Sequence, residues 1–191
     1  MSGSPLLDRH KQALDLFSSR VHAIRDDQWD APTPCTEWPV RALVNHLTGE
    51  QLWVPDLVRD GRTVAEVGDA YDGDVLGDDP VAAWDRAAAG AREAFAEDGA
   101  LDRTVSLSSG DTPATAYCSQ MITDAVVHAW DLSRAIGADE RLPPQLVDFA
   151  LREVTPYADS LAASGLFADP VPSPPDADAQ TRLLNMMGRR T

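Results

Sequence analysis

The stretch TAYCSQMITDAVVHAWDLSRAI, which runs from Thr115 to Ile136, decides the fold. Its apolar residues recur at spacings that keep them on one face of an α-helix. Gly137 follows the stretch and is a typical C-terminal helix stop. A helix of this length must bury its apolar face against other helices, so the stretch predicts an all-α bundle. The residues of that face are Tyr117, Met121, Ala125, Leu132 and Ala135.

Two polar residues of the same stretch point toward the predicted core. Asp124 and His128 lie one helical turn apart, and His128 lies close to the average direction of the apolar face. A carboxylate on a core face costs several kcal/mol unless it is paired or bound to a metal. Asp124 and His128 therefore form either a structural hydrogen-bonded pair or two ligands of a divalent metal, with Asp131 as an outer partner.

The rest of the chain supplies the other helices of the bundle. Helical periodicity covers Leu7 to Ile24, a segment from Pro39 to near Gly61, a segment that starts at Pro80, and about Pro144 to Ala163. Thr104 to Asp111 alternates and ends in a turn signal, which predicts a short strand or hairpin. We expect a bundle of four main helices over residues 1–165. A polyproline strap and a short helix, roughly Asp178 to Met187, follow within residues 166–191 and pack on the same domain.

The predicted second helix contains another polar anomaly. His46 lies beside Leu43 and Leu47, near the apolar face, and Glu50 follows one turn later. Two histidines and a carboxylate from two helices would give a three-ligand site with open positions, the layout of a catalytic metal. A histidine such as His46, taken alone, is more often a helix-surface or hydrogen-bonded core residue than a metal ligand. His10 could face the same cavity as a third imidazole, whereas His22 is expected on the surface.

Composition excludes several function classes. The chain has 31 acidic and 16 basic residues, a formal net charge of −15, which disfavours nucleic acid and membrane surfaces as partners. No apolar run approaches the ~20 residues of a membrane span, and the first residues lack a secretory signal pattern, so we expect a cytoplasmic protein. Cys35 and Cys118 are too few and too far apart for a disulfide scaffold and are interpreted as small buried thiols.

The acidic and aromatic residues have simpler interpretations. Five aspartates between Gly68 and Pro80 are expected in a solvated loop, since their spacing does not match an EF-hand calcium loop. The five tryptophans are expected to form core and pocket walls. The aspartates are Asp69, Asp72, Asp74, Asp78 and Asp79, and the tryptophans are Trp29, Trp38, Trp53, Trp84 and Trp130.

Several runs of residues resemble a known family. PCTEWPVRALVNHL, from Pro34 to Leu47, resembles the second-helix entry of the DinB-like bundles. More specifically, it resembles the actinobacterial branch related to the N-terminal domain of mycothiol-dependent maleylpyruvate isomerase. DAVVHAWDL, from Asp124 to Leu132, is similar to the second metal motif of that branch. The runs FADPVP from Phe167 and PPD from Pro174, with Arg182 to Leu184, are similar to the tail of an uncharacterised subfamily of metal-binding proteins.

The resemblance implies a DinB-like four-helix bundle that holds a divalent metal through His46, Asp124 and His128. The related isomerase has glutamate where this chain has Asp124. Zinc is the expected metal, and nickel is the next candidate. The isomerase also has a C-terminal domain for which this sequence leaves no room, so we expect a reaction other than maleylpyruvate isomerisation itself.

These features give one function hypothesis and two alternatives. The hypothesis is a metal-dependent transferase or isomerase that uses a low-molecular-weight thiol, with mycothiol implied by the resemblance, to attack a small electrophile. Asp131 or Glu50 would orient a ligand or accept a proton, and Arg41 and Arg134 are candidate anion holders. The first alternative is a non-catalytic metal- or small-ligand-binding protein of the same fold, and the second is a bundle with structural histidines. A homodimer through helix faces is also compatible with the sequence.

Overall fold

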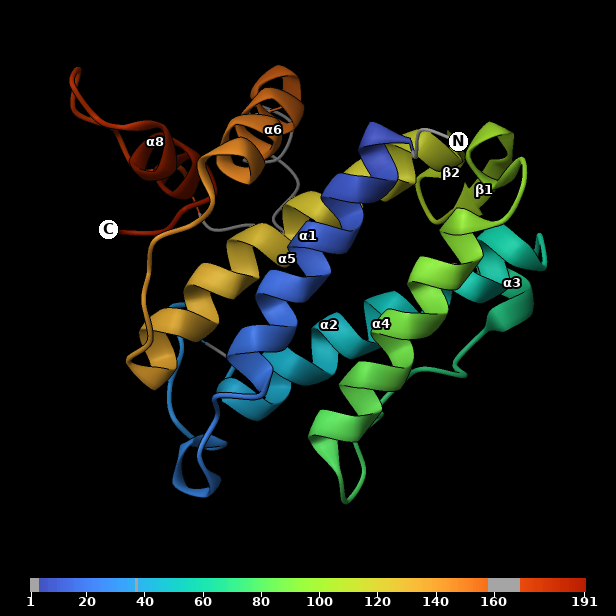
Figure 1. Ribbon diagram of the computed structural model, residues 1–191, viewed down its shortest axis with the longest axis horizontal. Coiled ribbons are helices and arrows are strands. Elements are labelled where there is room, and N and C mark those ends of the chain that lie inside the picture. Colours follow the sequence, from blue (N-terminus) through green and yellow to red (C-terminus); the bar gives the residue numbers. More distant parts are fainter. Residues whose placement is uncertain (1–3, 37, 158–168) are drawn as a thin grey trace.

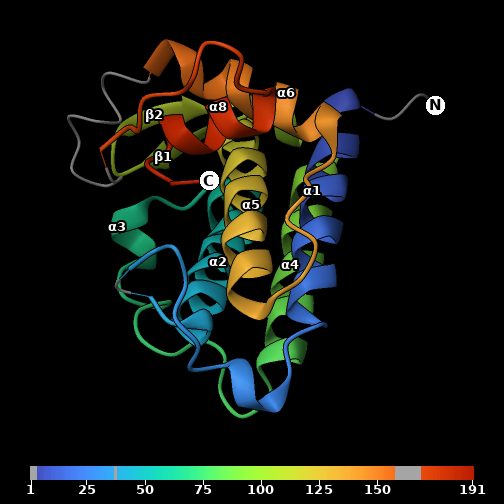
Figure 2. The same cartoon turned by 90° about the vertical axis from the view of Figure 1, so that its left-hand side faces the viewer.

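The computed structural model describes residues 4–36, 38–157 and 169–191. Four long helices form the bundle: α1 (Pro5–Val21), α2 (Val40–Val54), α4 (Pro80–Ala96) and α5 (Ala114–Ile136). The most extensive packing joins α1 to α5 and α2 to α4, and Figures 1 and 2 show these helices side by side. The predicted all-α bundle is confirmed.

Large apolar side chains from every long helix meet in one core. Phe17 of α1 packs against Trp84 of α4, with 4.7 Å between ring centroids, and both side chains are fully buried. Residues 125–133 of α5 are buried on all sides. The single inward stripe predicted for this helix is therefore too narrow. Besides α1 and α2, α6 (Pro144–Val154) packs on α5, and Cys35 and Arg189 contact its residues His128 and Asp131.

Several helices differ in detail from the expectation based on periodicity. The first helix ends at Val21 and not at Ile24. The N–H groups of Ala23 and Ile24 donate to carbonyls three residues earlier, which is the pattern of a 3₁₀ turn. Pro55 lacks an N–H, and the chain continues α2 as a π-helical turn from Pro55 to Arg59. The predicted helix from Pro144 ends at Val154, because Pro156 follows within a 3₁₀ turn from Thr155 to Tyr157. The remainder of that prediction, to Ala163, lies partly outside the described residues.

A short hairpin leads into α5, as expected. Strands β1 (Thr104–Leu107) and β2 (Gly110–Pro113) pair antiparallel, with Leu107 opposite Gly110. The hairpin base is joined to the helix by a hydrogen bond of 2.9 Å from the Ala114 N–H to the Arg103 carbonyl. A one-turn helix that the sequence analysis did not predict, α3 (Val64–Val67), precedes the acidic segment.

The acidic segment, residues 68–79, is a solvated loop whose five aspartates are exposed, as expected, and it is also attached to α2. The Asn45 side chain donates to the Gly73 carbonyl at 2.8 Å and accepts from the Val75 N–H at 2.9 Å. Arg41 binds both the Asp74 carboxylate, at 2.8 Å, and the Gly77 carbonyl, at 2.9 Å. The Tyr71 hydroxyl donates to Asp56. The sequence analysis did not predict these contacts, because Arg41 and Asn45 lie outside the apolar face of α2.

The C-terminal segment also contributes to the core. Helix α8 (Ala179–Met186) begins after Asp178, whose carboxylate accepts from the Thr181 N–H at 2.7 Å. The helix packs on α6 through Leu183 and Leu184, both fully buried. The proposed boundary between residues 165 and 166 lies outside the described residues and stays a prediction. Among the helices of the described residues, none is both long and apolar enough to cross a membrane.

Candidate metal centre

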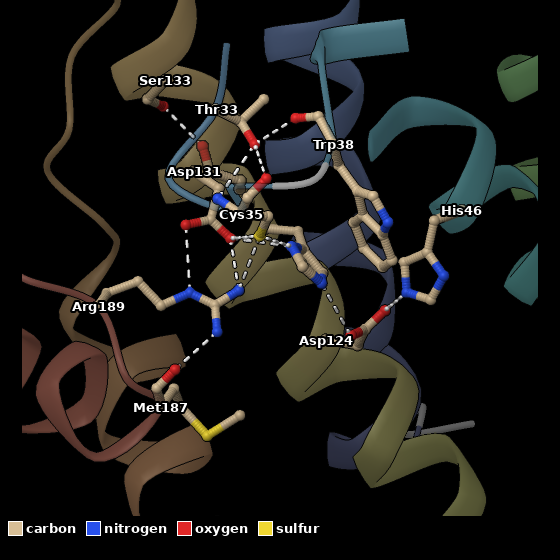
Figure 3. Close-up of polar contacts among 11 residues, drawn as sticks. Thr33, Cys35, Trp38, His46, Asp124, Asp131, Ser133, Met187 and Arg189 are labelled. Carbon is tan, nitrogen blue, oxygen red and sulfur yellow. Dashed lines mark hydrogen bonds and ion pairs between the residues drawn. The ribbon is translucent and has the colours of Figure 1, made fainter. Parts of the chain in front are cut away.

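The three predicted ligands come together between α2 and α5. Asp124 is between the two imidazoles: one of its oxygens lies 3.4 Å from Nε2 of His128, and the other lies 3.7 Å from Nε2 of His46. One ligand atom from each residue lies within 4.8 Å of the others. Figure 3 shows His46 and Asp124 directed toward one another from their separate helices.

The loop before α2 shapes one side of this group. The Thr33 hydroxyl donates to the Trp38 carbonyl at 2.7 Å, and the Trp38 N–H donates to the Cys35 carbonyl at 2.7 Å. These bonds place the Trp38 indole against the His46 ring, with 4.6 Å between centroids and 38° between planes. This loop, which contains Pro32 and Pro34, thus restricts the orientation of His46 (Figure 3).

The electrostatics of the group favour a carboxylate between two imidazoles. Burial opposes the charge on Asp124, but the attraction of His128 and His46 is larger and lowers the pKa of this carboxyl. Burial likewise opposes protonation of His128, yet Asp124, Asp131 and Cys35 raise the pKa of His128 well above its usual range. Burial lowers the pKa of His46, and the attraction of Asp124 offsets only part of this decrease.

The donor set fits a divalent ion such as zinc. Two ligands bound to tetrahedral zinc at about 2.0–2.1 Å lie roughly 3.3 Å apart. The separations of 3.4 and 3.7 Å between Asp124 and the two imidazole nitrogens are close to this value. One Asp124 oxygen, Oδ2, is buried and has no hydrogen-bond partner among the described residues. An unpaired buried carboxylate oxygen is costly, and a bound cation would satisfy it.

Asp131 holds the other side of the His128 ring. Its Oδ2 lies 2.9 Å from Nδ1 of His128, which leaves Nε2 directed at Asp124. Arg189 donates to both Asp131 oxygens, at 2.7 and 3.2 Å. Burial would raise the pKa of Asp131, but the bonds from His128 and Arg189 lower it to about 2. Asp131 thus has the contacts expected of a residue that orients a metal-ligating histidine. Both of its oxygens already accept hydrogen bonds (Figure 3).

Cys35 and Arg189 belong to this network, although the sequence analysis assigned neither to the site. Cys35 is half-buried, and its sulfur lies 3.3 Å from Asp131, 3.9 Å from Nδ1 of His128 and 3.2 Å from Arg189. Cys35, His128 and Asp131 could also surround an ion. However, the Arg189 guanidinium already occupies the polar side of this second group and would repel a cation. Cys118 is a buried thiol, as expected.

A pocket opens beside His46, which is the one candidate ligand among the described residues that line it. Its volume is about 680 Å³, and His46 and Glu50 form part of its wall together with the acidic segment. Trp38, Trp53 and Tyr71 supply aromatic wall, which agrees with the expected role of two of the tryptophans. Burial, with a smaller contribution from Asp124, raises the pKa of Glu50 to about 7. Glu50 thus lies in the pocket with a pKa suited to proton transfer near neutrality.

The remaining predicted residues lie in different places. His10 packs edge-on against Phe95, with 5.0 Å between ring centroids, and does not lie with His46 and His128. The expectation that His10 supplies a third imidazole to the same cavity is therefore wrong. His22 is on the surface, as expected, 2.9 Å from Asp85. Arg41 lines the pocket but is bound to Asp74. Arg134 lies on the exposed side of α5, over the Trp130 ring, and cannot hold an anion in this pocket.

The fold and the site together define a class of protein: a four-helix bundle with an imidazole–carboxylate group between two helices and a pocket beside it. The chain belongs to the family described as the mycothiol maleylpyruvate isomerase N-terminal domain, whose model matches residues 10–133. The expected family is therefore confirmed.

Relatives and solved structures agree with this membership. An uncharacterized protein of Mycobacterium tuberculosis, Rv0738 in strain H37Rv and MT0763 in strain CDC 1551, is 31% identical over 182 residues, which cover 94% of this chain and 95% of the relative. The crystal structure of the mycothiol-dependent maleylpyruvate isomerase is similar in fold, with a TM-score of 0.62 and 15% identity, over 85% of this chain and 72% of that chain. A mutant of that enzyme gives a TM-score of 0.63 and 14% identity over the same shares.

Proposed function

We propose that this protein is a divalent-metal-dependent enzyme that uses a low-molecular-weight thiol to transfer or isomerise a small electrophile. The observation that carries the proposal is the group of His46, Asp124 and His128, in which a buried carboxylate oxygen lacks a hydrogen-bond partner among the described residues and His46 lines an open pocket. Membership in the family makes mycothiol the first thiol to test.

His46, Asp124 and His128 would hold the ion. Two imidazoles and one carboxylate leave coordination positions free, a ligand set that suits zinc first and also suits nickel. When bound, the ion would supply a Lewis acid that favours the thiolate form of a thiol.

Other residues of the chain would divide the remaining tasks. Asp131 would orient His128, since its oxygens are already bound to His128 and Arg189. Glu50 would accept the proton that the thiol loses, because it lines the pocket and has a pKa of about 7. A bound cation would lower that pKa and leave Glu50 ionised as an acceptor. Trp38 would keep the His46 ring in place.

The first experiment is metal analysis by elemental mass spectrometry on protein purified without a metal-affinity tag. We expect close to one divalent ion per chain in the wild type and its loss in His128→Ala and Asp124→Ala. His22→Ala is the matched control, since His22 is exposed and bound only to Asp85. If no variant changes the metal content, or no ion binds after incubation with zinc or nickel, the proposal is wrong.

The second experiment measures thiol conjugation to model electrophiles by the metal-loaded protein. Turnover that requires His46 and falls at least tenfold in Glu50→Gln would support the enzyme. Metal-dependent stability without turnover of any thiol would instead indicate a non-catalytic metal- or ligand-binding protein.

A further inference from the structure

Gly49 lies in the middle of α2, and neither its backbone conformation nor its packing explains why this residue is a glycine. Eight glycines of the described residues have a positive φ, a conformation that favours glycine. Two more, Gly49 and Gly90, lie inside the helices α2 and α4. Glycine in a helix interior is less favourable than alanine, because it loses more conformational freedom on folding.

The surroundings of these two helical glycines differ. A methyl group added to Gly90 would lie 3.7 Å from the side chain of Pro55, an ordinary contact with the turn that follows α2. A methyl group added to Gly49 would meet no heavy atom of the described residues within 4 Å, apart from its own helix. Gly49 instead lines the pocket beside His46. A side chain at position 49 would therefore occupy only the space of the pocket.

Gly49 lies on the side of α2 that faces the acidic segment. Asn45, Gly49 and Trp53 follow one another at intervals of four residues, which places them on one side of the helix. The Asn45 side chain donates to the Gly73 carbonyl at 2.8 Å. Trp53 meets Tyr71 edge-on, with 5.6 Å between ring centroids. Contacts on both sides of Gly49 thus connect α2 to the acidic segment, and all five residues line the pocket.

An open stretch of the pocket lies between these two connections. Asn45 and Trp53 are eight positions apart, which corresponds to about 12 Å along the helix axis. Because Gly49 has no side chain, the backbone of α2 forms the floor of the pocket at this point. His46 and Glu50 line the same pocket next to Gly49. A molecule bound at His46 would therefore extend over Gly49, between α2 and the acidic segment.

We propose that Gly49 determines the specificity of the pocket by leaving room for the organic body of the thiol that binds at His46. The inference deepens the proposed function and rests on it, because the thiol is the nucleophile of that reaction. It assigns the thiol to a structural class: its body is branched or cyclic within about one helical turn, ~5 Å, of the sulfur. A side chain at position 49 would exclude such a body and would affect a small thiol less.

Two alanine variants separate this role from a structural one. Gly49→Ala and Gly90→Ala each replace a glycine inside a helix, and the added methyl group fits at both positions. We expect the urea midpoint of both variants to rise above that of the wild type, because alanine favours the helix. A lower midpoint for Gly49→Ala would show that the fold itself requires glycine at this position, and the inference would then be wrong.

The binding of one bulky and one small thiol measures the specificity. Benzyl mercaptan and 2-mercaptoethanol are titrated into the zinc-loaded protein, and NMR follows the indole N–H signal of Trp53, which lines the pocket. The preference for benzyl mercaptan, expressed as the ratio of the two dissociation constants, should fall at least threefold in Gly49→Ala and at least tenfold in Gly49→Leu. The alanine variant carries the test by itself if the leucine variant does not fold.

Two controls match these changes outside the pocket. Gly90→Ala adds the same methyl group to α4, and Ala89→Leu adds a leucine at an exposed position of the same helix. Both controls should keep the ratio of the wild type. A Gly49→Ala protein with the ratio of the wild type would overturn the inference, as would an equal fall in Gly90→Ala.

The inference and the proposed function fail separately. Benzyl alcohol, which has the same body without the thiol, is also titrated into the metal-free protein. Weaker binding of benzyl alcohol to Gly49→Ala, in a protein that takes up no metal, would keep the role of Gly49 in the pocket and remove the enzyme. Metal binding and thiol turnover, with an unchanged thiol preference in Gly49→Ala, would keep the enzyme and remove the inference.

Discussion

His10 is a buried histidine outside the candidate site, 1% exposed, and its Nε2 atom has no hydrogen-bond partner among the described residues. Burial, with a smaller repulsion from Arg92, lowers the pKa of His10 to about 4. The unfolded chain has a histidine pKa near 6.5, so between these values the unfolded state binds the proton more readily. The titration of His10 therefore costs the fold no stability above about pH 6.5. As the pH falls from there toward 4, the free energy of unfolding decreases.

We predict that His10→Leu reduces the acid sensitivity of the fold. From pH 7 to pH 4, the free energy of unfolding of the wild type should fall by about 3 kcal/mol more than that of the variant. Near pH 7 the two proteins should be similar, since the variant loses the contact with Phe95 but also loses an unpaired polar atom. Urea unfolding at several pH values measures the difference. Parallel stability curves for the two proteins would contradict the prediction.

At the scale of single residues, the sequence indicated the parts of the site that lie on regular helices. Asp124 and His128 share a helical face by their spacing, and the structure places them 3.4 Å apart. Cys35 and Arg189 reach the same histidine and its partner Asp131 from a loop and from the C-terminal segment. Helical periodicity cannot predict where these two residues lie, because the path of a loop depends on tertiary contacts such as the bond from Thr33 to Trp38.

The C-terminal segment and α5 are joined by a buried ion pair. Arg189 and Asp131 have side-chain exposures of 9% and 0%. Removing one partner of such a pair leaves the other charge buried without compensation, at a cost of about 3–5 kcal/mol. We therefore expect Arg189→Gln to lower the free energy of unfolding by up to this amount, since His128 still bonds Asp131, and to weaken metal binding through loss of His128 orientation.

Chemical denaturation and a zinc competition assay measure both effects. Arg190→Gln is the control, since its side chain is exposed and the substitution removes the same charge. Adding Asp131→Asn to Arg189→Gln should recover part of the stability, because a buried carboxylate that only His128 would still bond is then absent. An Arg189→Gln protein as stable as Arg190→Gln would show that the ion pair does not support the fold.

At the scale of elements, helix positions were predicted more accurately than the paths of connections. Leu14, Leu43 and Leu47 lie in the core at the spacing that the sequence shows. The acidic segment was expected in solvent, because like charges and glycines predict exposure. Its attachment depends on two polar residues on the outer side of α2, Arg41 and Asn45, and helical periodicity gives no information about their partners.

For the whole molecule, metal binding should appear as added stability. A ligand that binds only the folded state at 100 times its dissociation constant adds about 2.7 kcal/mol. For a chain of this size, that corresponds to a rise in Tm of roughly 5–10 °C. Thermal scans with zinc and with a chelator should show this rise in the wild type and in His22→Ala, and no rise in His46→Ala. An equal rise in His46→Ala would place zinc binding elsewhere.

The sequence predicted the fold of the whole molecule correctly but not the mutual placement of its parts. Hydrophobic patterning establishes that four long helices share a core. It does not determine that α1 pairs with α5 while α2 pairs with α4. That pairing locates the candidate ligands. Helix α2 belongs to one pair and α5 to the other, and the ligands lie where these two helices pack against each other (Figure 2).

The pairing of α1 with α5 has a consequence for synthesis of the chain. Helix α1 is made first, yet its apolar face lacks its main partner until α5 has left the ribosome, about a hundred residues later. At ~5–20 residues per second, this interval lasts roughly 5–20 s. During it α2 and α4 can already associate, and Phe17 can contact Trp84 of α4, while the face of α1 that packs on α5 stays accessible to water and to chaperones. The nascent protein thus passes through a stage in which α1 exposes part of its apolar face.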